Sequence, residues 1–205
     1  MRFVAGILLA FCALTAHARE QSDLRTFGEP SASTIYLFTS PNCPHCRSFH
    51  KTIFPEILKR YVKTKRAQVL IVDMVYDDAA LQASMLMRCL PEDKSQKMMN
   101  WLYENQARWT KARNSKEFFL QYALPLGMTI NEFNACLSDE SLKEAVEWQR
   151  DSLGGLYQIK GWPTVVLRQE NTVKQFVGVD KHAVLYGLET DIKSFEQRQK
   201  AAQKK

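Results

Sequence analysis

The sequence predicts an α/β protein, in which a central mixed sheet is flanked by helices and interrupted by an inserted helical subdomain. Two β-branched, apolar runs at 34–40 and 68–75 are separated by a helical pattern over roughly 44–63. A strand, a helix and a strand of this size form a right-handed crossover between parallel strands. The pattern is then helical over about 78–140, and strands return near the C-terminus.

Each of the first elements has a local signal. The strand at 34–40 is bounded by Ser33 and Pro41, which are typical of strand ends. Pro55 lies inside the helical pattern that follows and predicts a kink there. The run at 68–75 is almost continuously apolar, as expected for a strand that is covered on both faces.

The middle of the chain is helical by pattern, with breaks at Pro91 and Asn114. Three helices are expected there, at 77–89, 95–113 and 115–124. Capping boxes, in which Ser or Thr is followed three residues later by Glu, predict two further helix starts. They are Thr129 with Glu132, and Ser141 with Glu144.

The C-terminal part of the chain predicts a hairpin and a final helix. A strand at 165–168, a turn at 169–171 and a partner strand at 172–177 are followed by a helix at about 181–202. Because residues 19–205 have about the length of one domain, a single domain is expected.

The first residues have the composition of an export signal. Arg2 gives a positive start, residues 3–14 are apolar, and Ala16 and Ala18 place small side chains where a signal peptidase cleaves. The apolar run is shorter than the roughly 20 residues that cross a bilayer. We therefore expect cleavage after Ala18 and location in the periplasm or cell envelope.

The expected division is a signal peptide at 1–18 and one mature domain at 19–205. Two alternatives remain, a lipoprotein with the lipid on Cys12 and a retained anchor. Basic residues outnumber acidic ones by 28 to 22, but they are scattered among acidic residues without aromatic side chains on a common face. Nucleic-acid binding is therefore not expected, and we expect a monomer.

Four cysteines remain after the expected cleavage, and in an oxidising compartment cysteines usually pair. Cys43 and Cys46 form a C-x-x-C motif that follows a strand and opens a helix. A structural disulfide or half of a zinc site are the alternatives for such a motif. His50 falls at helical spacing from both cysteines, but no fourth ligand is evident, so neither a metal nor another cofactor is expected.

The position of Cys43 predicts a reactive thiolate. At a helix start, unpaired backbone N–H groups and the positive end of the helix dipole stabilise negative charge on its sulfur. Pro44 is tolerated at the first helical position, and His45 adds a ring N–H or a positive charge. Cys46 lies one turn further and is expected to be the more buried. Because a stabilised thiolate favours the reduced form, the disulfide form should be an oxidant.

The Cys43-Pro44-His45-Cys46 quartet resembles the active site of the DsbA-type periplasmic oxidases, a thioredoxin-fold family with a helical insertion. The resemblance extends over nearly all of the mature chain, from the approach at 27–30 to the loop at 161–164. The pattern of two cysteines in the insertion, Cys89 and Cys136, resembles that of the branch that also includes Com1-like and BdbD-like proteins.

This resemblance implies that Pro163 is a cis-proline that lies against the redox pair. The substrate peptide would then bind along the neighbouring backbone of Gly161, Trp162 and Thr164 as an added strand. Implied partners are unfolded or newly exported cysteine-containing proteins and a DsbB-like, quinone-linked membrane reoxidase. Two departures stand out, since Trp162 replaces the usual Val or Thr, and Leu37 occupies a position that often holds a buried carboxylate.

Three functions are compatible with the motif. A donor of disulfides to exported proteins is the first, and an isomerase or reductase of wrong disulfides is the second. Known isomerases dimerise through a separate N-terminal domain. The about 15 residues between the expected cleavage site and the first predicted strand leave no room for such a domain. The third is a redox-inert peptide-binding protein of the envelope, which would need neither Cys43, Cys46 nor Pro163. We therefore expect the donor.

Cys89 and Cys136 are predicted to form a second, structural disulfide. Both belong to the helical insertion, and each lies near a predicted helix end. The alternative is two separate buried thiols that pack as small apolar side chains.

Overall fold

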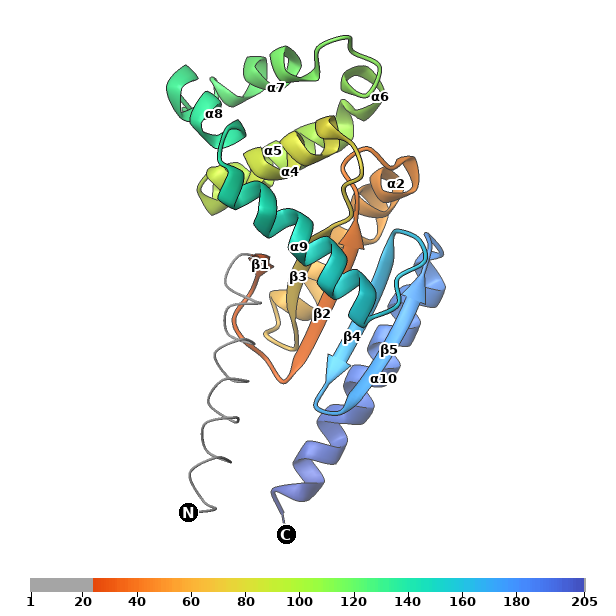
Figure 1. The fold of residues 1–205 in the computed structure, drawn as a ribbon. Helices are drawn as coiled ribbons and strands as arrows, with labels where there is room; N and C mark the ends of the chain where they lie inside the picture. Colours follow the sequence, from red (N-terminus) through yellow and green to blue (C-terminus); the bar gives the residue numbers. More distant parts are fainter. Residues whose placement is uncertain (1–23, 205) are drawn as a thin grey trace, which may run out of the picture.

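The computed structural model describes residues 24–204, so the expected signal peptide and its cleavage site lie outside the described residues. Within these residues five strands form one sheet in the order β1-β3-β2-β4-β5 (Figure 1). The strands are β1 (Arg25–Phe27), β2 (Ser33–Thr39), β3 (Gln68–Asp73), β4 (Thr164–Gln169) and β5 (Thr172–Val177).

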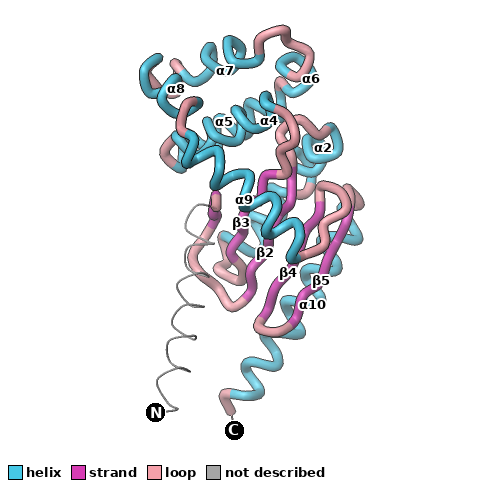
Figure 2. Tube along the Cα trace, viewed as in Figure 1, coloured by secondary structure: helices cyan, strands magenta, loops and turns pink. Residues whose placement is uncertain are grey.

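Helices cover the sheet. The segment of chain that runs from the end of β3 to the start of β4 forms only helices and loops (Figure 2). On the described part of the chain they are α2 (Pro44–Thr52), α3 (Phe54–Ile57), the π-helical turn η1 (Leu58–Val62), α4 (Asp78–Cys89), α5 (Glu92–Glu104), α6 (Gln106–Trp109), α7 (Ser115–Ala123), α8 (Ile130–Leu137), α9 (Glu140–Leu156) and α10 (Lys181–Ala202).

The sheet is mixed and flanked by helices, which confirms the predicted fold class. β2 pairs parallel with β3, and it pairs antiparallel with β4, which in turn pairs antiparallel with β5. Every residue of β2 and β3 is buried, as their apolar sequences predict. The helices α4 to α8 form a block at one end of the sheet, beside α2 (Figure 1).

Two features of the first third differ from the prediction. β1, which pairs antiparallel with β3, was not expected, because three half-buried residues are too few to show an alternating pattern. The predicted helix at 44–63 is divided into α2, α3 and η1. Pro55 lies in the first turn of α3, where its missing N–H costs little. The helix is therefore interrupted just before this proline.

One of the two predicted capping boxes is present. Thr129 accepts from the backbone N–H of Glu132, whose carboxylate accepts from the N–H of Thr129. The box predicted at Ser141 is wrong, because Asp139 caps α9 and accepts from the N–H of Leu142 at 3.0 Å. The hydroxyl of Ser141 donates to that same carboxylate.

Alternate residues of β2 pack against opposite layers, as the pleat of a strand requires. Ile35 and Leu37 join the large core formed with α2, α10 and the helical block. Tyr36 and Phe38 face the other way, and there they pack with Tyr157 after α9. Between residues 24 and 204, no helix has both the length and the apolar composition to cross a membrane.

Candidate active site

The C-x-x-C motif lies at the junction of β2 and α2, as predicted. Cys43 is the N-cap of α2, and its sulfur accepts a hydrogen bond from the backbone N–H of Cys46 at 3.4 Å. Pro44 follows in the first turn of the helix. Pro44 and His45 are exposed, Cys43 is half-buried, and Cys46 is 0% exposed. Cys43 is therefore the sulfur that a second protein can reach.

Both cysteines are free thiols in this structure, and their surroundings separate their acidities. The pKa of Cys43 falls from 9.0 to about 6, chiefly because the thiol of Cys46 donates to its sulfur. Partial burial opposes this effect, while the backbone N–H groups of Cys46 and His45 and the charge of His45 add to it. Burial, and then that same hydrogen bond, raises the pKa of Cys46. The reduced pair therefore holds a thiolate on Cys43 and a thiol on Cys46.

The loop at 161–164 is brought against this pair. The Trp162–Pro163 peptide bond is cis, and the carbonyl oxygen of Trp162 lies 3.8 Å from the Cys43 sulfur. The loop is anchored on two sides, because Thr164 donates its hydroxyl hydrogen to the Gly161 carbonyl at 2.7 Å and the N–H of Gly178 donates to the Pro163 carbonyl at 2.9 Å. The loop that was expected from the sequence therefore lies beside the Cys43 sulfur and contacts it through the Trp162 carbonyl.

An aromatic stack that the sequence reasoning missed continues from Trp162. Tyr76 lies almost parallel to Trp162, with ring centroids 5.3 Å apart, and is 64% exposed. The guanidinium group of Arg150 lies 5.0 Å from the centre of the Tyr76 ring. Tyr76 follows β3 at the edge of the sheet where β2 leads into Cys43. The sequence held one signal for Tyr76. It follows a strand that was predicted to run parallel to the strand before Cys43, so both residues were expected at the same end of the sheet.

Contacts from the helical block hold the active-site turn. The side-chain amide of Gln106 donates to the carbonyl of Pro41 at 2.7 Å and to the carbonyl of Cys43 at 2.9 Å. Gln106 is buried although it is polar, so these two bonds satisfy both of its donors. Nothing in the sequence distinguished this glutamine. Asn42, in the turn itself, is bonded to Asp77.

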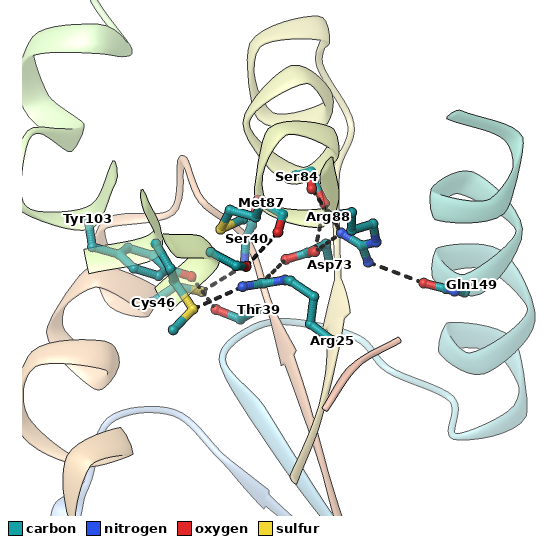
Figure 3. Close-up of polar contacts among 12 residues, drawn as sticks. Arg25, Thr39, Ser40, Cys46, Asp73, Ser84, Met87, Arg88, Tyr103 and Gln149 are labelled. Atoms are coloured by element: carbon teal, nitrogen blue, oxygen red, sulfur yellow. Dashed lines mark hydrogen bonds and ion pairs between the residues drawn. The ribbon is translucent and has the colours of Figure 1, made fainter. Parts of the chain in front are cut away.

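Polar groups lie beneath the buried sulfur (Figure 3). The N–H of Ser40 donates to Cys46 at 3.4 Å, and the hydroxyls of Thr39 and Tyr103 are 2.8 Å apart. Leu37 is buried in the apolar core, so the carboxylate that is often found at its position is absent. The sequence had singled out neither of these two hydroxyls.

A buried ion network lies next to these groups (Figure 3). The carboxylate of Asp73, whose side chain is 0% exposed, pairs with Arg25 at 3.2 Å and with Arg88 at 2.6 Å. Ser84 also donates to it at 2.6 Å. Although burial alone would raise its pKa, the two guanidinium groups and the hydroxyl hold the pKa of Asp73 below its ordinary value.

His50, which was weighed as a metal ligand, has other contacts. Its ring stacks between Phe54 and Tyr103, and its Nε2 atom lies 2.9 Å from the amide oxygen of Asn100. Burial lowers its pKa to about 4. Across residues 24–204 no group of three or more His, Cys, Asp or Glu side chains is arranged to hold a metal ion.

The two remaining cysteines belong to the helical block and not to this site. Cys89, the last residue of α4, forms a disulfide with Cys136 of α8, with Cα atoms 6.1 Å apart. The disulfide joins α4 and α8 through two cysteines that are 47 residues apart in the sequence.

Sequence comparisons agree with this geometry. A family model described as thioredoxin matches residues 20–177. The chain is 24% identical over 183 residues to a candidate protein-disulfide oxidoreductase of Rickettsia conorii, covering 89% of this chain and 64% of the relative. It is 27% identical over 128 residues to another from Rickettsia bellii, covering 62% of this chain and 49% of the relative. The chain thus spans less than two thirds of the length of these relatives.

Solved structures share the fold. Wolbachia pipientis alpha-DsbA1 superimposes with a TM-score of 0.74 at 18% identity, covering 86% of this chain and 92% of that one. Oxidised BdbD from Bacillus subtilis gives a TM-score of 0.70 at 18% identity, with 83% and 94% covered. The chain therefore belongs to the thioredoxin family and has the fold of its DsbA-like members.

Proposed function

We propose that this protein is an exported thiol–disulfide oxidoreductase that donates its Cys43–Cys46 disulfide to newly translocated proteins. The observation that carries the proposal is the unequal pair of sulfurs. The Cys43 sulfur is accessible, caps the N-terminus of α2 and has a lowered pKa, whereas the Cys46 sulfur is buried and has a raised pKa. A low thiolate pKa stabilises the reduced protein, and this makes the disulfide a better oxidant.

The exchange follows from this inequality. A client thiolate attacks the Cys43 sulfur, the Cys43–Cys46 bond breaks, and its electron pair leaves on Cys46. A second client thiolate then attacks the client sulfur of the mixed disulfide and expels Cys43 as a thiolate. The client loses two electrons and the protein gains them. Cys46 takes up a proton because its pKa is raised, whereas Cys43 remains ionised near neutral pH.

Client binding is assigned to the loop beside Cys43. In this proposal an extended client peptide pairs with the backbone of Gly161, Trp162 and Thr164, next to Pro163. The Trp162 carbonyl, 3.8 Å from the reactive sulfur, supports this position. The Trp162 ring, stacked on an exposed tyrosine, would offer a flat apolar surface to client side chains that flank the cysteine.

Export and partners complete the proposal. Residues 1–18 act as a cleaved signal, and residues 19–205 work as a monomer in the periplasm or cell envelope, with the helical insertion at about 78–140. Clients are unfolded or newly exported proteins that contain cysteines. Because each cycle leaves the protein reduced, a membrane reoxidase linked to quinones must remove two electrons.

The test is oxidation of a reduced dithiol peptide by the purified, oxidised mature protein. Cys43→Ser should abolish oxidation, and Cys46→Ser should accumulate mixed disulfides through Cys43. The Cys89→Ser/Cys136→Ser double variant keeps the active-site pair and should still oxidise the peptide, which makes it the matched control. If the wild-type protein leaves the dithiol unchanged but rearranges a scrambled disulfide substrate, the donor function is wrong and isomerisation replaces it.

A further inference from the structure

The buried sulfur of Cys46 has a hydroxyl pair beneath it. Thr39 is the last residue of β2, and the next residue, Ser40, donates its backbone N–H to the Cys46 sulfur at 3.4 Å. The Thr39 hydroxyl lowers the pKa of Cys46, as a donor to its sulfur does, against the larger effect of burial, which raises it. On its other side, the Thr39 hydroxyl meets the hydroxyl of Tyr103 from α5 at 2.8 Å. All three residues are buried, and Figure 3 shows the paired hydroxyls of Thr39 and Tyr103 next to the Cys46 side chain. A row of tyrosine, threonine and cysteine thus links the helical block to the redox pair.

The chemistry of the two hydroxyls gives this row a direction. A phenol is a better hydrogen-bond donor than an aliphatic alcohol, and burial raises the pKa of Tyr103, so it keeps its proton. Tyr103 therefore donates to the Thr39 oxygen. Thr39 has one hydrogen, and with its oxygen occupied as an acceptor this hydrogen is available to Cys46. Hydrogen bonds in such a row polarise and strengthen one another.

We propose that Thr39 is a catalytic residue that donates a hydrogen bond to the Cys46 sulfur as the disulfide breaks, and that Tyr103 is a positioning residue that orients Thr39. The inference rests on the proposed exchange reaction. In the disulfide the Cys46 sulfur is neutral and accepts weakly, whereas in the transition state it gains the leaving electron pair. A donor that binds mainly the charged sulfur stabilises the transition state more than the disulfide ground state, and so it lowers the barrier.

The charged and titratable groups around this row agree with a donor role. Burial is the main cause of the raised pKa of Tyr103; the negative charge that Cys46 gains when it leaves and the charge of Asp73 raise the pKa further, and Arg25 lowers it. The ring of His50 stacks on Tyr103. Because a carboxylate is absent from the position of Leu37, no buried acid at that position competes for the leaving sulfur. The hydroxyl row and the Ser40 N–H, at 3.4 Å, supply the stabilisation instead.

The experiment measures one bond-breaking step. Reduced glutathione, a single thiol, attacks the oxidised protein at Cys43 and expels Cys46, and its second-order rate constant is compared among variants. Thr39→Val keeps the shape of the side chain without the hydroxyl, Thr39→Ser keeps the hydroxyl, and Tyr103→Phe keeps the ring. Tyr61→Phe is the matched control, since the hydroxyl of this buried tyrosine donates to the Leu185 carbonyl at 3.2 Å instead.

Thr39→Val should react about tenfold more slowly, because a hydrogen bond to a developing charge is lost. The reverse rate should fall equally, so the equilibrium with glutathione near pH 7 and the Cys43 pKa should stay almost unchanged. A variant that damaged the site in general would change both the equilibrium with glutathione and the Cys43 pKa. Thr39→Ser should restore the rate, and Tyr103→Phe should lower it several-fold. Adding Tyr103→Phe to Thr39→Val should slow the reaction no further, since one acts through the other.

The outcomes separate this inference from the proposed function. If wild-type protein does not exchange with glutathione at all, the proposed function fails. If wild-type protein exchanges and a folded Thr39→Val variant matches its rate, the role of Thr39 is overturned while the function stands. If Thr39→Val does not fold, Tyr103→Phe decides, because it leaves β2 untouched; a wild-type rate then overturns the inference. Equal slowing by Tyr61→Phe would also overturn it.

Discussion

The lowered pKa of Cys43 predicts that the reduced protein becomes more stable as the pH rises through neutrality. In the folded, reduced protein this thiol ionises near pH 6, whereas its ordinary pKa, expected in the unfolded chain, is 9.0. Between these values the unfolded state binds more protons than the folded state, so the free energy of unfolding increases with pH. The contribution is complete above the unfolded pKa and is lost as the pH falls through the folded pKa.

The size of the effect follows from the two pKa values. At pH 7 a gap between about 6 and 9.0 corresponds to about 1.4 kcal/mol of added stability for the folded state. Cys43 is only half-buried, and solvent screens the interactions of such a group, so we expect ~1 kcal/mol. Cys46 does not contribute in this range, because its pKa is raised and it stays protonated in both states.

The assay is urea unfolding of the reduced protein at about pH 5 and about pH 7, compared with reduced Cys43→Ser. The difference in the free energy of unfolding between the two proteins should grow by ~1 kcal/mol between these conditions. Oxidised wild-type protein, which has no free thiol at this site, should lack the increase. Identical pH dependence in the reduced wild type and in Cys43→Ser would refute the assignment of a stabilised thiolate to Cys43.

Three further predictions concern the framework. Replacing Cys89 and Cys136 by Ser should destabilise the protein by up to about 4 kcal/mol in urea unfolding, because the disulfide closes a loop across 47 residues; full reactivity of these thiols in unreduced, unfolded protein would contradict it. Asp73→Asn should cost about 3–5 kcal/mol, because two buried guanidinium groups lose their carboxylate, and a loss below ~1 kcal/mol would show that the network is not needed. Gly187→Ala would place a Cβ atom 2.2 Å from the Phe176 ring and should lower stability by about 1–3 kcal/mol, while dithiol oxidation by the folded protein stays unchanged.

Local sequence was sufficient for the reactive half of the site. The pKa of Cys43 is lowered chiefly by the thiol of Cys46 one turn along the helix, and then by the backbone N–H groups of Cys46 and His45 and the charge of His45. Such effects act over a few residues, so a strand followed by C-x-x-C and a helical pattern predicts them without knowledge of the fold. The hairpin of β4 and β5 and the helix α10 were predictable for the same reason, since turn residues and caps are local signals.

The environment of Cys46 depended on tertiary structure. Thr39 and Tyr103 are 64 residues apart, and Gln106 lies 63 residues beyond the carbonyl of Cys43 that it binds. Their meeting is decided by how α5 and α6 pack on the end of the sheet, and no periodic pattern in the chain encodes it. The stacking of Tyr76 on Trp162 joins two loops in the same way. The sequence by itself determined which sulfur is activated, because helix-end electrostatics are local. Only the packed fold decided which groups surround the sulfur that leaves, because burial brings distant side chains together.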